Sequence, residues 1–185
     1  MTQPTRRELA NAKTYALLNV SEEDMRQAAF YARHLLKKGW HSEEWERRGT
    51  VYYQQAAFTT ALVMAYTRPF TQTRGGSSLN GKTMAGFTEE QKQLHKRMKL
   101  LRINIFAHTD ISTRRVRPMS LEGYPTAIEA VPPMRLLQWE VQHLQTMIAL
   151  VQRAVAEQKR KLLPVVSTGD FGRPVQPRLP QPKKS

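Results

Sequence analysis

Apolar residues recur at three- and four-residue steps along most of the chain. This spacing places them on one face of a helix. It predicts helices over residues 21–38, 42–66, 88 to about 108 and 132–162, with a shorter helix over residues 6–18. Because such helices must bury their apolar faces against one another, we predict an all-α fold. The expected architecture is an antiparallel bundle of four to five helices, with one long loop and a disordered C-terminal tail.

The ends of these segments carry helix-capping residues. Ser21 and Ser42 each precede a run of acidic residues, as N-cap residues often do. Thr88 with Gln91 matches a capping box, and Gly39 stands where a left-handed residue is expected to end a helix. Prolines mark further boundaries of the predicted helices: Pro69, Pro132 and Pro133.

The last predicted helix carries two neighbouring apolar rows. One row keeps a strict alternation of three and four: Met134, Leu137, Val141, Leu144, Ile148, Val151 and Val155. The other row lies beside it: Leu136, Met147, Leu150 and Ala154. The first row can face the bundle while the second faces another subunit, as in a helical homodimer. Alternatively, both rows belong to one core, and the pattern alone leaves both arrangements open.

Three segments lack the helical period. Residues 70–87 are rich in Gly, Ser and Asn and predict a loop that is long for a compact domain. Residues 109–131 are expected to form either a loop or a short hairpin that turns near Glu122–Gly123. The end of the chain is polar, basic and rich in Pro. We therefore predict one helical domain, residues 1–162, and a disordered tail, residues 163–185.

Charge points to the class of partner. The chain holds 29 Lys and Arg against 15 Asp and Glu, a formal net charge of +14, and such an excess attracts polyanions. We expect the cations to bind the phosphate backbone of RNA or another nucleic acid; a solvated basic surface without a ligand is the alternative. The cations are densest in residues 91–117, where Asp110 is the single acid. This stretch holds eight of them: Lys92, Lys96, Arg97, Lys99, Arg102, Arg114, Arg115 and Arg117. Aromatic residues that could stack on bases lie nearby: Phe87, Phe106 and Tyr124.

Composition and motifs exclude several other classes of site. The chain has no Cys, which excludes a disulfide scaffold, a thiolate metal site and a cysteine nucleophile. It lacks a P-loop, a paired-His zinc helix and a carboxylate cluster typical of a two-metal site, so we expect neither a metal nor another cofactor. The most apolar window, residues 51–66, is too short and too polar to span a bilayer. Since no signal-peptide pattern is present, we expect a cytoplasmic protein that does not bind membranes.

Arg102 and His108 are the residue types needed to cleave RNA without a metal. A His can take or give the proton of the 2′-hydroxyl or of the leaving oxygen. The guanidinium group of an Arg can stabilise charge on the phosphate. Asp110 or Thr109 can orient the imidazole, as a carboxylate does in a catalytic triad, and the polar Asn104 lies between the pair.

Helix geometry sets a condition on this pair. Six residues of an ideal α-helix separate Arg102 and His108 by about 120°, so they converge only where the helix ends or bends, or where two subunits share the site. His95 lies seven residues before Arg102, shares its face and is therefore a competing partner. His108 can instead be a core residue, because it continues an apolar stripe: Leu94, Met98, Leu101 and Ile105.

The segment LRINIFAHTD, residues 101–110, resembles the HEPN superfamily of helical nucleotide-binding domains. The hallmark of that superfamily is an Arg followed four to six residues later by a His, near the end of a long helix. The AYTRPF segment at residues 65–70 and the long final helix are similar to those of HEPN proteins as well. At the level of helix order, the likeness covers about residues 21–160.

The resemblance implies a homodimer that cleaves RNA without metal, serves as a toxin or in defence against phage, and has an antitoxin or a larger assembly as partner. It would make Arg102 the phosphate-stabilising residue, His108 the catalytic His and Arg68 a second residue of the cleft. Active members usually carry a polar residue directly after the Arg, where this chain has Ile103; Asn104 is polar but offset by about 100°. Inactive members bind or scaffold, so the alternative function is a catalytically inactive nucleic-acid-binding or assembly subunit.

Overall fold

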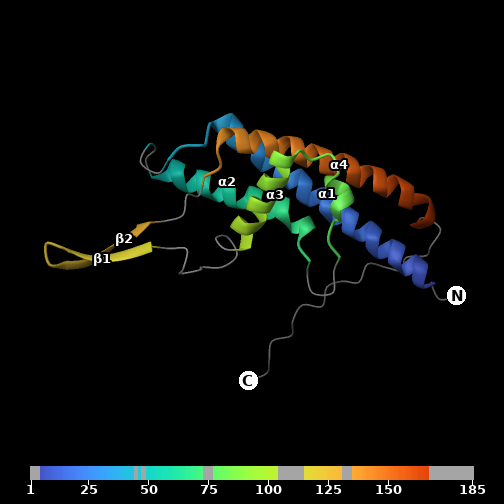
Figure 1. Cartoon of the computed structure of the whole chain (residues 1–185), viewed down its shortest axis with the longest axis horizontal. Coiled ribbons are helices and arrows are strands. Elements are labelled where there is room, and N and C mark those ends of the chain that lie inside the picture. The colour runs from blue at the N-terminus through green and yellow to red at the C-terminus, as the bar shows by residue number, and fades with distance from the viewer. Residues whose placement is uncertain are drawn as a thin grey trace, which may run out of the picture.

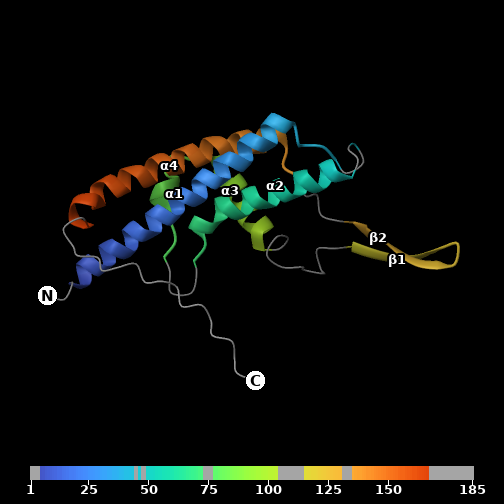
Figure 2. The same cartoon turned by 180° about the vertical axis from the view of Figure 1, so that it is seen from behind.

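The computed structural model describes residues 5–43, 46, 49–72, 77–103, 115–130 and 135–166. Its elements follow in this order: α1 (Arg6–Lys38), α2 (Thr50–Thr67), the 3₁₀ turns η1 (Arg68–Phe70) and η2 (Gly81–Met84), α3 (Glu89–Leu101), β1 (Arg115–Leu121), β2 (Tyr124–Ala130) and α4 (Gln138–Val166). The helix α1 packs against both α4 and α2, and α3 crosses α2 and α4 (Figure 1). The view from behind shows α1 and α4 side by side over most of their length (Figure 2). The predicted all-α antiparallel bundle is confirmed.

The helix α1 is one continuous element, so the predicted break before Ser21 is wrong. It begins at the N-cap Thr5, which forms a capping box with Glu8. Ser21 is buried inside the helix and caps nothing. The acidic residues after it have distant partners that a local pattern does not reveal, since Asp24 pairs with Arg68 across the bundle. The predicted end is confirmed, because Gly39 adopts the left-handed conformation with φ 62°.

The helix α2 begins at Thr50, eight residues later than the predicted start at Ser42. Ser42 lies outside any helix, where its backbone N–H donates to Gln55 Oε1 at 3.1 Å and its carbonyl accepts from Gln55 Nε2 at 2.8 Å. The side chain of Gln55 therefore takes the place of the helical hydrogen bonds that Ser42 was expected to begin. The predicted end is confirmed, because the turn that holds Pro69 follows directly.

The helix α3 begins as predicted. Thr88 accepts a hydrogen bond from the backbone of Gln91, and the side chain of Gln91 accepts one from the backbone of Thr88. The α-helix ends at Leu101, and a π-type turn follows at Arg102 and Ile103. The predicted helix end near residue 108 lies outside the described residues.

The helix α4 begins at Gln138 and runs to Val166. The described residues 135–137 are not helical, so the predicted start at Pro132–Pro133 is wrong. The predicted tail began at residue 163, but the helix continues through Pro164. Val166 is buried, so tertiary packing holds the last turn despite the proline, which lacks a backbone N–H.

Most described residues of both apolar rows belong to the core of the single chain, although Leu137 of the first row is 37% exposed. Val141, Leu144 and Ile148 of the first row are buried, and so are Leu136 and Met147 of the second. Leu150 is half-buried and packs against that core. The interpretation in which both rows contribute to one core is therefore correct, and the second row is not an uncovered subunit interface.

The two segments predicted as irregular both contain local structure. Residues 115–130 form the hairpin alternative, in which Leu121 pairs with Tyr124 and the turn falls at Glu122–Gly123. Both turn residues have positive φ, 49° and 83°, as a two-residue hairpin of type I′ requires. The loop predicted over residues 70–87 contains η2, which packs against α4.

Candidate functional site

The exposed face of α3 carries a row of lysines. Lys92, Lys96 and Lys99 are spaced by four and three residues, so they lie on one side of the helix. Lys92 and Lys96 are exposed and Lys99 is half-buried. Lys92 Nζ lies 3.4 Å from Glu89 Oε2, but an exposed pair of this kind is screened by solvent and contributes little. This α3 lysine row is therefore accessible to a ligand, and its binding to a phosphate backbone stays a prediction.

Arg97 differs from the lysines, although the sequence analysis grouped them together. Its guanidinium group forms an ion pair with Glu140 of α4. The side chain of Glu140 is only 1% exposed, and its other oxygen accepts the backbone N–H of Leu137 at 2.7 Å. Burial lowers the pKa of Arg97. Because its charge is matched by a buried carboxylate, the expected nucleic-acid-binding role of Arg97 is not supported.

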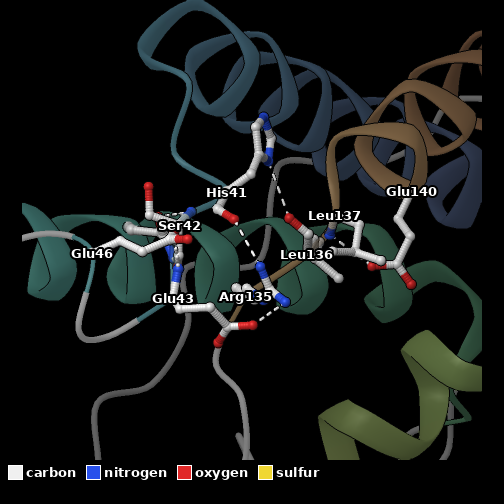
Figure 3. A network of polar contacts seen from close by, with 9 residues as sticks. His41, Ser42, Glu43, Glu46, Arg135, Leu136, Leu137 and Glu140 are labelled. Carbon is white, nitrogen blue, oxygen red and sulfur yellow. Dashed lines mark hydrogen bonds and ion pairs between the residues drawn. The ribbon is translucent and has the colours of Figure 1, made fainter.

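A polar network holds that carboxylate in place (Figure 3). His41 Nδ1 lies 3.0 Å from the carbonyl oxygen of Leu136, and Arg135 donates to the carbonyl oxygen of His41 at 3.2 Å. Arg135 also pairs with Glu43. The network fastens the segment after α1 to the start of α4, where Glu140 lies. Sequence reasoning missed it, because its halves lie more than ninety residues apart.

His95 is a buried residue of the core. Its Nδ1 lies 2.9 Å from the hydroxyl oxygen of Tyr66, and its ring meets those of Phe70 and Phe87 edge-on. Burial, and to a smaller extent the charge of Lys99, lowers the pKa of His95 to about 4. His95 is therefore neutral at pH 7 and bonded to Tyr66, and the prediction that it competes as a partner of Arg102 is not supported. Phe87 is buried too, so it offers no surface for base stacking.

Arg68 lies where α2 ends and donates to Asp24 Oδ1 at 2.8 Å. The carboxylate of Asp24 is nearly buried. Burial raises the pKa of Asp24, and the neighbouring Arg68 acts in the opposite direction. Arg68, expected to be a second residue of the cleft, thus has a structural partner on α1.

Arg102 lies in the π-type turn that follows α3 and is half-buried. Its Nη1 atom is buried and has no hydrogen-bond partner among the described residues. A buried donor without a partner is uncommon and costly. Regular α-helical geometry ends at Leu101, and His108 lies outside the described residues. Ile103, beside Arg102, is 50% exposed.

The other predicted site residues are only partly described. Arg115 and Arg117 lie in β1, paired in register with Ala130 and Ile128, and Tyr124 begins β2. The remaining predicted residues lie outside the described part of the chain: Asn104, Phe106, His108, Thr109, Asp110 and Arg114. The structure therefore brings Arg102 next to the α3 lysine row, and it leaves the pairing with His108 as a prediction.

Metal-binding clusters and membrane-spanning helices are both absent from the described residues. No group of three or more His, Asp or Glu side chains in this part of the chain could hold a metal ion. None of the helices in it combines the length and the apolar character needed to cross a membrane.

The chain was compared with protein-family models, with curated proteins and with solved structures, and none of the three comparisons gave a match. The resemblance to the HEPN superfamily consequently remains a prediction that rests on residues 65–70 and 101–110.

Proposed function

We propose that this protein binds RNA along α3 and cleaves it without a metal, with Arg102 and His108 as the catalytic residues of a HEPN-like site. The observation that carries the proposal is the buried Nη1 atom of Arg102, which has no partner in the described structure and follows directly on the α3 lysine row. The side chain of Arg102 as a whole is only half-buried. Its covered Nη1 atom would reach a phosphate oxygen only after the groups over it move, and it would then gain a partner that it lacks, because charge-assisted hydrogen bonds from guanidinium to phosphate are strong and directional.

The proposed reaction is an internal transesterification of RNA. The 2′-oxygen attacks phosphorus, the bond from phosphorus to the 5′-oxygen breaks, and a cyclic phosphate remains on the upstream fragment. One proton leaves the 2′-hydroxyl and another is delivered to the departing 5′-oxygen. His108 carries out one of these proton transfers. Arg102 stabilises the negative charge that grows on the phosphate oxygens.

The resemblance supports the biological part of the proposal. A homodimer places two Arg–His pairs in one cleft, and an antitoxin or a larger assembly restrains the activity. A toxin or phage-defence role in the cytoplasm is consistent with the net charge of +14, which favours polyanionic partners.

The decisive experiment incubates the purified protein with a mixed RNA pool in EDTA. Arg102→Ala and His108→Ala are each expected to lower the rate by at least about 100-fold, the usual range for loss of a proton-transfer group or a charge-stabilising donor. Arg160→Ala on the exposed end of α4 is the matched control for the loss of one positive charge, and it is expected to cleave normally. Cleavage that survives in the His108 variant would exclude the proposed mechanism.

A specific observation favours a second function, an RNA-binding or assembly subunit without catalysis. Ile103 directly follows Arg102 and is 50% exposed, and this position is usually polar in active members of the family that the chain resembles. This alternative predicts salt-dependent RNA binding without turnover. The same RNA pool distinguishes the two functions, because only the first gives fragments.

A further inference from the structure

The outward face of α1 carries an exposed aromatic residue between two arginines. Arg26, Phe30 and Arg33 are spaced by four and three residues and therefore lie on one side of the helix. The side chain of Phe30 is 51% exposed. A shallow hollow of about 350 Å³ surrounds it and is lined by Glu23, Arg26, Gln27, Phe30, Tyr31 and Arg33. We call this surface the Phe30 hollow.

Neighbouring rings hold the side chain of Phe30 in place. Its ring meets that of Tyr31 edge-on, with the centroids 5.5 Å apart, and the ring of His34 lies 6.1 Å away. His34 in turn stacks on Phe58 of α2, with the centroids 4.3 Å apart. Phe30 is thus the exposed end of an aromatic cluster, and a ring that is already ordered loses little entropy when a ligand stacks on it.

The cations of the Phe30 hollow can bind phosphate. Arg26 Nη1 lies 2.8 Å from Glu23 Oε2, but both side chains are more than half exposed, so this pair is weak and can exchange for another anion. Arg33 is exposed, and no ion pair of its side chain is found in the described part of the chain. A planar guanidinium group on either side of an aromatic ring suits a base with a phosphate on each flank.

We propose that Phe30 is a stacking platform for one unpaired base of the bound RNA, with Arg26 and Arg33 binding the phosphates next to that base. This inference rests on the proposed RNA binding and specifies the substrate as single-stranded. Bases in a duplex are stacked on each other and do not offer a free face. A folded protein partner would need a larger apolar area than one aromatic side chain supplies.

The test measures the binding of a single-stranded oligonucleotide of 2′-O-methyl RNA, which lacks the attacking 2′-hydroxyl and stays intact. Phe30→Leu keeps an apolar side chain but removes the aromatic face, and it is expected to weaken binding about tenfold. Phe30→Tyr is expected to bind like the wild type. Tyr53→Leu is the matched control, because Tyr53 on α2 is the more exposed aromatic residue at 74% and lies outside the hollow. A duplex of equal length is expected to bind Phe30→Leu and the wild type equally.

Each other outcome overturns the inference. If Phe30→Leu binds normally while replacement of the α3 lysine row weakens binding, the Phe30 hollow is not a binding site and the proposed function stands. Equal losses for Phe30→Leu and Phe30→Tyr, or for single-stranded and duplex RNA, would exclude base stacking. A wild-type protein that binds no RNA would overturn both proposals. Thermal unfolding of each variant, expected to match the wild type, shows that the comparison is made on folded protein.

Discussion

Arg97 and Lys96 are adjacent on α3 but have different electrostatic surroundings. Lys96 is exposed to solvent, whereas Arg97 pairs with a carboxylate that is 1% exposed. In sequence the two cations look equivalent, because Glu140, the partner of one of them, follows forty-three residues later. The sequence therefore predicts that α3 is basic, but it cannot show which of its charges is already neutralised within the protein.

Arg97→Met is expected to lower the free energy of unfolding by about 2–4 kcal/mol, because it leaves the carboxylate of Glu140 buried without its cation. Lys96→Met is the matched control and is expected to change that free energy by no more than about 0.5 kcal/mol. For RNA affinity we expect the reverse order, with the larger loss in Lys96→Met. Urea denaturation measures the free energy of unfolding, and a binding titration measures RNA affinity. Equal stabilities of the two variants would contradict the stabilising ion pair of Arg97 with Glu140.

The burial of His95 makes stability depend on pH. Its pKa is about 4 in the folded protein and about 6.5 in an unfolded chain. Between these values the unfolded chain binds more protons, so the contribution of His95 is fully present above about pH 6.5 and decreases as the pH falls toward 4. The loss amounts to about 3 kcal/mol. His95→Gln is expected to remove this dependence, as measured by urea denaturation between pH 7.5 and 4.5. If the free energy of unfolding of the variant still fell with pH as in the wild type, His95 would not be the group responsible.

Among the helices, a sequence pattern predicts a helix end correctly where the residues that form its hydrogen bonds are close in sequence. The capping box of Thr88 and Gln91 joins residues three apart and was predicted correctly. Ser21 is not an N-cap, although the acidic residues after it resemble a first helical turn. Their partners lie on other elements, as in the pair of Glu22 with Lys159 of α4. Contacts of this range leave no trace in a short window of sequence.

Ser21→Ala distinguishes an N-cap from a buried residue inside a helix by the sign of the change in the free energy of unfolding. The hydroxyl oxygen of Ser21 is buried without a hydrogen-bond partner among the described residues, and Ala is the better helix former. We therefore expect the variant to raise the free energy of unfolding by about 0.5–1 kcal/mol. Thr88→Ala, which removes a true cap, is expected to lower it by about 1 kcal/mol. A loss in Ser21→Ala would mean instead that its buried hydroxyl group makes a stabilising contact.

At the scale of the whole molecule, the net charge of +14 is only partly available to a ligand. Several cations are bound to carboxylates inside the fold, among them Arg68, Arg97 and Arg135. The α3 lysine row remains accessible. Net charge predicts a polyanionic partner, whereas the choice of the α3 lysine row as the expected binding surface required the ion pairs of the folded chain.

The salt dependence of RNA binding tests whether RNA binds to the α3 lysine row or responds only to the net charge of the protein. Replacing Lys92, Lys96 and Lys99 by Ala is expected to reduce the slope of log K against log salt by about 2, since each contact with a single-stranded phosphate contributes about 0.7. The matched control removes three cations of α4: Arg153, Arg160 and Lys161. We expect its slope to stay near that of the wild type. Equal reductions in both variants would show that binding follows net charge alone.

The pairing of α1 with α4 has a consequence for the order of events during synthesis. These are the first and last helices of the described chain, and about 100 residues separate Lys38 from Gln138. At about 5–20 residues per second, the ribosome needs roughly 5–20 s to make that intervening stretch. Throughout this time the apolar face of α1 has no α4 to cover it. The nascent chain must therefore pass through a stage in which its longest helix offers an uncovered apolar surface to chaperones.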